Sequence, residues 1–245
     1  MRLIISPAKK MIGEADVAHR DLPVFIDRAE ILREWVCSLS YDEQKRLWAC
    51  SDAIATQNAE RFAHMDLRSG LVPALLAYDG IQYTYMAPTV FEDGHFDYVQ
   101  GHLRILSGFY GVLRPFDGVV PYRLEMQAKA SVAGCSNLYE FWGDSLYQEV
   151  VRDDHVVINL ASNEYAKAVK RHLQPEDTFV TCTFGELQND RVVQKGVYVK
   201  MARGEMVRYL AGIQATDVEQ LKGFAWSGYA YDEARSTPAN YVFVR

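Results

Sequence analysis

Apolar residues recur every three or four positions over much of the chain, a spacing that is typical of amphipathic helices. The clearest stripe follows Pro23 and includes Leu32, Val36 and Leu39. A second helix is expected to begin at Ser40-x-x-Glu43, which matches a capping box. The same spacing predicts helices at residues 23–39, 40–62, 73–78, 138–151, 163–172, 202–210 and 217–221.

Short runs of β-branched and aromatic residues indicate the strands. The run 156–160 is apolar enough for a central strand, and Leu3-Ile4-Ile5 predicts a short buried strand before Ser6-Pro7. Further strands are predicted at residues 179–184, 192–199 and 241–244. Because strands alternate with helices and the chain shows no repeat or linker, we expect an α/β fold: a single domain, residues 1–245, with a mixed β-sheet surrounded by helices.

Two glycines interrupt a further apolar stripe that runs from Phe96 to Leu106. Each glycine costs roughly 1 kcal/mol relative to alanine inside a helix, so Gly108 and Gly111 predict a turn between two helices. This turn is either a corner in the core or a helix-hairpin-helix-like element, whose backbone N–H groups would hold a phosphate. Pro115 shortens the second of these helices.

A rival for the hairpin lies near the C-terminus, at Tyr209-Leu210-Ala211-Gly212-Ile213-Gln214. Its L-x-G-I core resembles the first glycine turn. The alternative is a glycine that ends one helix, followed by a new N-cap at Thr216.

Composition and charge exclude several classes of protein. The 245 residues are 49% hydrophobic and carry a formal net charge of −6, which gives no overall basic signal for nucleic acid. No stretch approaches about 18 uncharged apolar residues and the N-terminus does not resemble a signal peptide, so we expect a cytoplasmic protein with no membrane contact. The four cysteines lie far apart, without the spacing of a zinc or disulfide framework.

Familiar cofactor and nucleophile motifs are absent from the sequence, which contains no Walker A loop, G-x-G-x-x-G fingerprint or G-x-S-x-G elbow. The acidic segment with Glu92, Asp93, His95 and Asp97 matches no metal-ligand spacing and is interpreted as a solvated loop. We therefore expect no cofactor and no metal.

Five polar residues are candidates for a binding cleft. Arg123 and Glu125 alternate around Leu124 and form either a buried ion pair or an anion contact in which Glu125 orients Arg123. Asn58 lies on an apolar helix stripe with Arg61 nearby, and Asn159 lies near the end of a central strand, where α/β sheets commonly place sites. Asn58, Arg61 and Asn159 thus define a possible pocket.

Several blocks of sequence, in order from end to end, resemble the bacterial peroxide-stress protein YaaA family. They are Ile5-Ser6-Pro7-Ala8-Lys9, the stretch 103–117, Pro121-Tyr122-Arg123-Leu124-Glu125-Met126, Leu138-Tyr139-Glu140-Phe141-Trp142-Gly143-Asp144, residues 157–165 and Ala202-Arg203-Gly204. The chain departs from the family at Asp79-Gly80-Ile81-Gln82-Tyr83, where the family often shows K-G-D-V-Y. This departure changes the charge of any site to which the loop contributes.

The resemblance implies a family-specific single-domain α/β fold with a helix-hairpin-helix element and a positively charged cleft. It also implies binding of double-stranded DNA, a link to recombinational repair, and protection against peroxide by limiting free iron. Carried over by position, the DNA-binding residues are Lys9, Arg61, Gly108, Phe109, Tyr110, Gly111, Arg114, Arg123 and Arg203, with Asn58, Glu125 and Asn159 as polar cleft residues.

Three hypotheses follow for the function. The first is a stress protein that binds double-stranded or branched DNA through backbone phosphates, without sequence readout. The second is an enzyme of unknown reaction whose polar cleft takes a small phosphorylated or nucleotide-like substrate, that is, a small anionic ligand. The third treats the buried polar residues as an internal network that contributes only to stability.

Overall fold

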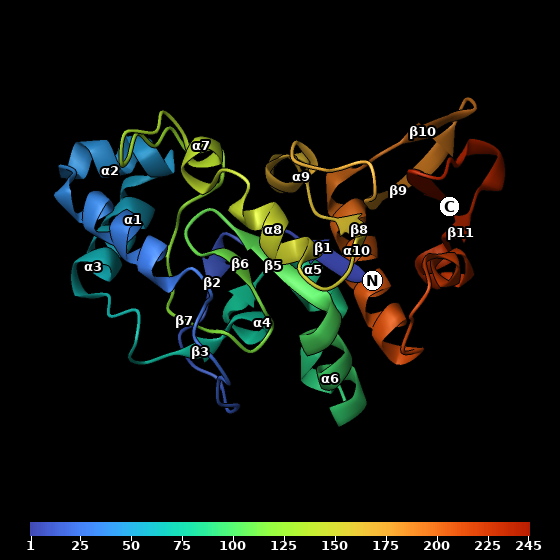
Figure 1. Ribbon diagram of the computed structural model, residues 1–245, viewed down its shortest axis with the longest axis horizontal. Helices are drawn as coiled ribbons and strands as arrows, with labels where there is room; N and C mark the ends of the chain where they lie inside the picture. Colours follow the sequence, from blue (N-terminus) through green and yellow to red (C-terminus); the bar gives the residue numbers. More distant parts are fainter.

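An eight-stranded mixed sheet forms the centre of the computed structural model, which describes residues 1–245 (Figure 1). Its strand order is β11-β12-β9-β8-β1-β5-β6, with β10 paired to β9. The five strands from β12 to β5 run parallel, and β6, β10 and β11 are antiparallel to their neighbours. The strands are β1 Arg2–Ile5, β5 Leu103–Ser107, β6 Gly111–Leu113, β8 Val156–Leu160, β9 Thr178–Gln188, β10 Arg191–Val193, β11 Ala230–Tyr231 and β12 Asn240–Val244.

Two short antiparallel ladders lie outside this sheet: β2 (Lys10–Met11) with β4 (Tyr78–Asp79), and β3 (Val72–Pro73) with β7 (Gly118–Val119). The helices are α1 Ile26–Ser38, α2 Tyr41–Trp48, α3 Asp52–His64, α4 Ala74–Ala77, α5 Ile81–Met86, α6 Asp93–His102, α7 Leu138–Trp142, α8 Ser145–Val151, α9 Asn163–Lys170 and α10 Gly196–Gly212. Four 3₁₀ helices join them: η1 Pro88–Val90, η2 Val218–Gly223, η3 Trp226–Gly228 and η4 Glu233–Arg235. No helix has the length and apolar composition needed to cross a lipid bilayer.

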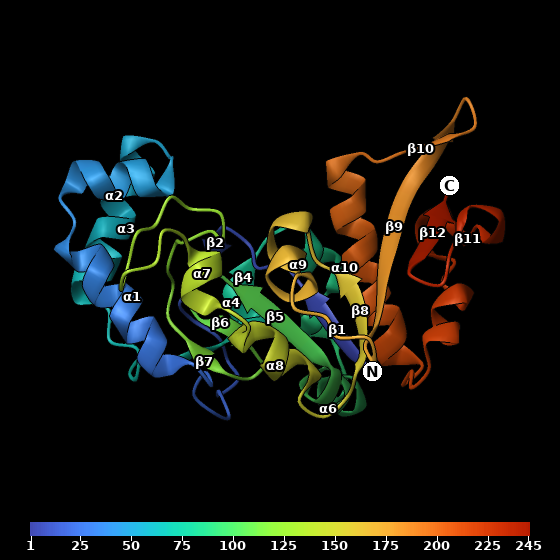
Figure 2. The same ribbon diagram turned by 45° about the horizontal axis from the view of Figure 1, so that its top comes forward.

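Helices cover both faces of the sheet (Figure 2). α8 and α9 contact each other on one face, and α10 contacts both α5 and α6 on the other. α1, α2 and α3 gather at one end of the molecule, beyond β6 (Figure 1). One connected cluster of 68 buried apolar residues extends through these layers. The predicted α/β architecture with a mixed sheet is therefore confirmed.

Several predicted helices are confirmed but are divided by local backbone turns. The capping box at Ser40 is present, because the Glu43 carboxylate accepts the Ser40 backbone N–H at 2.8 Å. The helix that it begins ends at Trp48, where Ala49 takes a left-handed conformation with φ 45°. The predicted helix 138–151 is likewise divided into α7 and α8 at Gly143, with φ 55°. A positive φ ends a right-handed helix, and glycine adopts it without a steric cost.

Three predicted elements are wrong. The acidic segment interpreted as a solvated loop forms the start of α6, which begins at Asp93 after the N-cap Glu92. The stripe from Phe96 to Leu106 continues as a helix only to His102, after which β5 and β6 form an antiparallel β-hairpin around residues 108–110. The predicted strand 192–199 ends at Val193, and α10 starts at Gly196. Because β5 is buried at every position, it lacks the alternation that would distinguish it from a helix segment.

The direction in which the chain winds reverses at β1. From β1 the chain adds β5 on one side, and it then crosses to β8, β9 and β12 on the other side. At such a reversal the connections leave adjacent parallel strands in opposite directions and open a crevice beyond their carboxyl ends. This topology places a crevice next to Ser6 and Ala161, the residues that follow β1 and β8.

Candidate functional site

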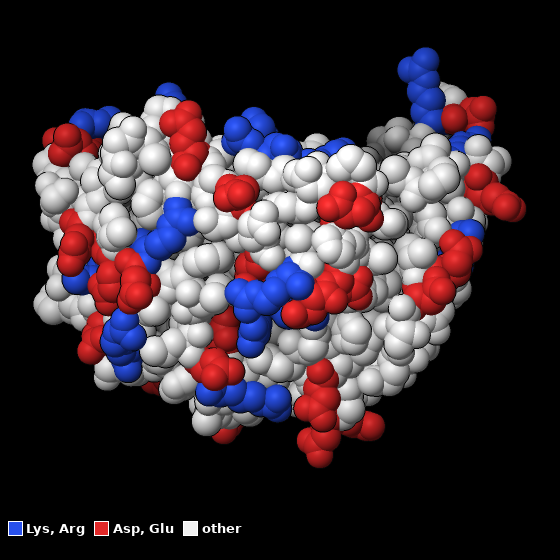
Figure 3. Space-filling view, viewed as in Figure 1, with Lys and Arg blue, Asp and Glu red and all other residues white.

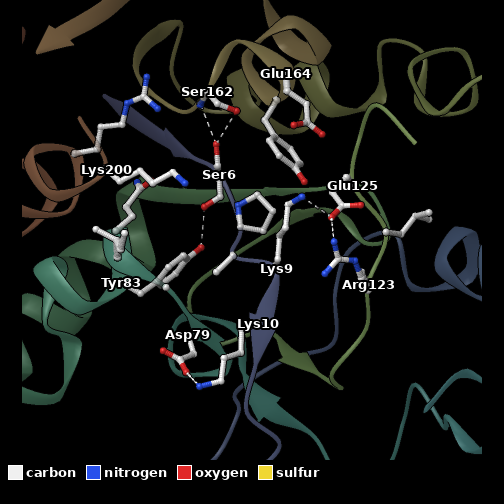
Figure 4. Close-up of a pocket in the computed structure, with 18 of the residues that line it drawn as sticks. Ser6, Lys9, Lys10, Asp79, Tyr83, Arg123, Glu125, Ser162, Glu164 and Lys200 are labelled. Atoms are coloured by element: carbon white, nitrogen blue, oxygen red, sulfur yellow. Dashed lines mark hydrogen bonds and ion pairs between the residues drawn. The ribbon is translucent and has the colours of Figure 1, made fainter. Parts of the chain in front are cut away.

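A pocket of about 530 Å³ lies at this crevice. The β1–β2 loop, the start of α9, the β4–α5 turn, α10 and the segment 122–125 all contribute to it (Figure 4). Its volume falls in the range of about 300 to 1,000 Å³ that is common for small-molecule sites. It is lined by Ser6, Pro7, Ala8, Lys9, Lys10, Asp79, Gly80, Ile81, Gln82, Tyr83, Tyr122, Arg123, Leu124, Glu125, Ser162, Glu164, Tyr165, Lys200 and Arg203.

Ser6 connects the elements at the centre of the pocket. Its hydroxyl accepts the Ser162 backbone N–H at 2.8 Å and lies 3.3 Å from the Ser162 hydroxyl. The Tyr83 hydroxyl donates to the Ser6 carbonyl at 3.0 Å. These contacts join the end of β1 to the start of α9 and to α5, so the position of the pocket wall is fixed by the strand ends (Figure 4).

An ion-pair cluster forms one wall. Glu125 Oε1 lies 3.0 Å from a terminal nitrogen of Arg123 and 3.2 Å from Lys9 Nζ. The side chains of Arg123 and Glu125 are largely buried, whereas Lys9 is mostly exposed. Both interpretations of the Arg123–Glu125 pair thus have structural support, since the two form an ion pair and also face the pocket.

Glu164 adds a second carboxylate near Glu125. One of its oxygens accepts the Gln127 backbone N–H at 3.2 Å, and it forms no ion pair. Burial, together with the negative charge of Glu125, raises the pKa of the Glu164 carboxyl above its ordinary value. The Glu164 carboxyl is therefore a group that gains from a further hydrogen-bond donor.

The packing of α10 against α5 builds the opposite wall. A Cβ on Gly204 would overlap the Gln82 carbonyl and lie 2.8 Å from the Met86 nitrogen, so only glycine allows these helices to approach so closely. The approach brings Lys200 and Arg203 of α10 beside Gln82 of α5. Neither Lys200 nor Arg203 has a carboxylate within ion-pair distance, and burial lowers the pKa of Arg203.

Three buried nitrogens of pocket-lining side chains have no hydrogen-bond partner. They are Gln82 Nε2, Arg123 Nε and Arg203 Nε. Gln82 is only 7% exposed. A buried polar group without a partner costs about 1 to 3 kcal/mol, so three of them around one cavity mark a place where acceptor oxygens are missing.

Four of the residues predicted for the site lie together in this pocket: Lys9, Arg123, Glu125 and Arg203. They come from three segments that are far apart in the sequence, the β1–β2 loop, residues 122–125 and α10, and β1 lies inside the sheet, between β8 and β5.

The predicted phosphate-binding turn has another role. Phe109 and Tyr110 are fully buried, and their backbone N–H groups donate to the Ser107 hydroxyl at 3.1 and 2.9 Å. These N–H groups are therefore not free to bind a phosphate. Gly111, with φ 76°, starts β6, and a Cβ there would contact Trp142 and Leu146 at 2.9 Å. The helix-hairpin-helix prediction is wrong at this position, where the glycines shape a buried β-hairpin.

The rival turn at Gly212 is not that element either. Gly212 is the last residue of α10, and the segment after it leads into η2, a 3₁₀ helix. The capping interpretation fits better, although the N-cap is Asp217 and not Thr216: the Asp217 side chain accepts the Glu219 backbone N–H at 2.8 Å.

The remaining predicted residues lie outside the pocket. Asn58 and Arg61 are in α3 at the far end of the molecule, where Asn58 donates to the Ile54 carbonyl at 2.8 Å (Figure 1). Arg114 lies 3.8 Å from the buried Glu149 carboxylate, beside a separate cavity of about 230 Å³. Asn159 is buried within β8 and accepts the Ala161 backbone N–H at 2.9 Å. The predicted pocket of Asn58, Arg61 and Asn159 does not form.

Several pocket residues were missed in the sequence, among them Gln82, Lys200, Ser6 and Ser162. A usable signal existed for the serines, because Ser6 directly follows a buried apolar strand and Ser162 comes two residues after another. Gln82 lies in the segment 79–83, where the chain departs from the family, but no pattern singled it out within that segment.

Comparisons with known proteins identify the family of this chain. A family model described as "Peroxide stress protein YaaA" matches residues 1–235. A UPF0246 protein of Desulfitobacterium hafniense is 52% identical over 246 residues, covering 100% of this chain and 98% of its own length. UPF0246 proteins of Agathobacter rectalis and Ligilactobacillus salivarius are 49% and 46% identical and cover 100% of this chain, with 99% and 100% of their own lengths. The chain belongs to the YaaA family of peroxide stress proteins.

Proposed function

We propose that this protein acts in the peroxide-stress response by binding a small phosphorylated or nucleotide-like anion in the pocket between β1 and β8. The family supports the stress role. The single observation that carries the ligand class is the set of three buried, unpartnered donors: Gln82 Nε2, Arg123 Nε and Arg203 Nε.

An oxyanion satisfies these donors better than a neutral ligand does. Phosphate offers several strong acceptor oxygens, and guanidinium groups match its geometry. The pocket is lined by five cationic side chains, Lys9, Lys10, Arg123, Lys200 and Arg203, against the three carboxylates of Asp79, Glu125 and Glu164. Glu125 and Asp79 are occupied by ion pairs, which leaves Lys200 and Arg203 for the ligand.

Binding of double-stranded or branched DNA, with the consequent limitation of iron-dependent damage, is the second candidate. The exposed lysines at the pocket rim favour it, because Lys9 and Lys10 are 69% and 75% exposed and could contact a phosphate backbone. Two observations weigh against a broad DNA surface. Arg61 and Arg114 lie away from the pocket, and basic and acidic side chains alternate over the face shown in Figure 3.

Isothermal titration calorimetry with inorganic phosphate, AMP and a plain DNA duplex tests the proposal. We expect phosphate and AMP to bind the wild-type protein and Arg203→Gln to weaken both at least tenfold. The matched control is Arg46→Gln, which removes an exposed arginine of α2 and leaves the affinity unchanged. If neither small anion binds, or if Arg203→Gln binds them as tightly as the wild type, the small-anion function is wrong. Duplex binding that weakens steeply with salt and ignores Arg203→Gln would favour the second candidate.

A further inference from the structure

The two walls of the pocket differ in chemistry. The wall formed by α5 and α10 presents donors: the Lys200 ammonium, the Arg203 guanidinium and the unpartnered amide nitrogen of Gln82. Since it contributes no carboxylate, a negatively charged group is stabilised along this wall.

The other wall presents acceptors. Glu125 uses one carboxylate oxygen for both Lys9 and Arg123, which leaves its second oxygen without an ion pair. Glu164 has no ion pair, and one of its oxygens accepts the Gln127 backbone N–H at 3.2 Å. The Glu164 carboxyl is partly buried and lies near the Glu125 carboxylate, and both effects raise its pKa. Carboxylate oxygens that face the pocket without an ion pair can accept hydrogen bonds from hydroxyl or amine groups of a ligand.

The walls face each other across the centre of the pocket. Figure 4 shows Lys200 on one side of Ser6, and Glu125 and Glu164 on the other side with Lys9. A bare phosphate occupies only a small part of 530 Å³ and could not satisfy both walls together. The occupant therefore needs an anionic end and a separate end that carries hydrogen-bond donors.

We propose that the ligand is a phosphate monoester with a hydroxylated body, the chemistry shared by pentose phosphates and nucleoside monophosphates, bound with its phosphate toward Lys200 and Arg203 and its hydroxyls toward Glu125 and Glu164. This assignment rests on the proposed anion-binding function and adds the polarity of the ligand, that is, which of its two ends faces which wall of the pocket. It makes Glu164 a specificity-determining residue.

Competition between matched ligands tests this polarity. Ribose 5-phosphate and phenyl phosphate are both phosphate monoesters, but only the first carries hydroxyls on its body. We expect ribose 5-phosphate to bind the wild-type protein at least tenfold more tightly than phenyl phosphate. Ribose without the phosphate should not bind measurably, and AMP should bind at least as tightly as ribose 5-phosphate if the body of the ligand is a nucleoside.

The variant Glu164→Met removes both acceptor oxygens at similar side-chain length. We expect it to abolish the preference for ribose 5-phosphate over phenyl phosphate. Thermal melting checks that the variant is folded, and the preference of the wild-type protein tests the inference independently of any variant.

Failure of this inference can be distinguished from failure of the proposed function. If phenyl phosphate binds as tightly as ribose 5-phosphate and both depend on Arg203, the anion-binding function holds and the polarity is wrong. The polarity is also wrong if Glu164→Met retains the full preference. If no phosphorylated probe binds the wild-type protein, the proposed function and this inference are both wrong.

Discussion

Gly108 positions the segment that carries Arg123 and Glu125 into the pocket. A Cβ at Gly108 would lie 2.5 Å from the Leu124 carbonyl oxygen and 2.9 Å from the Met126 nitrogen, so the hairpin turn packs directly against the backbone of this segment. Glycine is therefore required by close approach and not by phosphate binding.

Gly108→Ala is expected to lower the free energy of unfolding by about 1 to 3 kcal/mol, because backbone atoms must move to admit the methyl group. The displacement of Leu124 should also shift Glu125 and weaken phosphate binding. Urea denaturation and calorimetry measure the two effects. The control is Gly94→Ala in α6, where nothing lies within 4 Å of the added Cβ. Equal stability of both variants would show that the turn is not tightly packed.

Asp117 makes the stability of the protein depend on pH. The residue is 3% exposed, its carboxylate accepts the Arg114 backbone N–H at 2.8 Å, and burial raises its pKa to about 7 from the ordinary value of 3.8. Between these two values the carboxyl is ionised in the unfolded chain but retains its proton in the folded protein. The free energy of unfolding therefore decreases as the pH rises through this window.

Asp117→Asn should remove this dependence, because an amide does not ionise and still accepts the Arg114 N–H. We expect the variant to be more stable than the wild type at pH 8 by on the order of 2 kcal/mol, with a smaller difference at pH 5. Urea denaturation at several pH values measures the slope, with the exposed Asp16→Asn as the control. An unchanged slope in Asp117→Asn would contradict the assignment.

At the scale of elements, the crossing of α10 and α5 determines where Arg203 lies. Gly204 is the point of contact, since its added Cβ would overlap the Gln82 carbonyl. Gly204→Ala should push the helices apart, lower the free energy of unfolding by about 3 kcal/mol and move Arg203 away from Gln82.

The matched control for this crossing is Gly196→Ala at the first residue of α10, where nothing lies within 4 Å of the added Cβ. Urea denaturation compares the two variants. If Gly204→Ala is as stable as Gly196→Ala, the two helices are not held at the distance that the structure shows.

The sequence predicts those elements whose local pattern is unambiguous. The strand at 156–160 is recognisable because it is a run of apolar, mostly β-branched residues. The helix that follows it is recognisable because its apolar residues recur every three or four positions. β5 was missed because Leu103 and Leu106 continue the spacing of α6, although the chain extends after His102. Only pairing with β1, a non-local interaction, decides between the two conformations.

The site was predictable only in part for the same reason. Arg123 and Glu125 are candidates in the sequence because they alternate around Leu124 in an extended segment, and the pocket contains both. Asn58 is an equally strong candidate in the sequence, but its amide nitrogen donates within its own helix and the residue lies away from the pocket. A buried polar residue in the sequence does not reveal whether its partner is the backbone or a ligand, and Gln82 is recognisable only from its unpartnered nitrogen.

At the scale of the whole molecule, the pocket joins segments that span most of the chain. The β1–β2 loop, the β4–α5 turn, the segment 122–125, the start of α9 and α10 converge on it. One bound anion would therefore restrain all five segments together, while α3 at the far end would be unaffected (Figure 1). Ligand at about 100 times its dissociation constant stabilises a protein by about 2.7 kcal/mol, which corresponds to a rise in melting temperature of about 5 to 10 °C for a chain of this size.

Hydrogen exchange with and without ribose 5-phosphate tests this coupling. We expect slower exchange in segments around Ser6, Tyr83, Arg123, Ser162 and Arg203, with no change in α3, and no protection when the same ligand is added to Arg203→Gln. Adding duplex DNA in the same experiment distinguishes the two functional candidates, because it shows which segments the DNA protects from exchange. Protection confined to α3 would assign binding to the region of the predicted Arg61 contact, whereas protection at the five pocket segments would mean that a DNA phosphate enters the crevice at the reversal of the sheet. Because the residues that follow β1 and β8 both contribute to the pocket, a ligand bound there contacts segments from the N-terminal and the C-terminal parts of the chain.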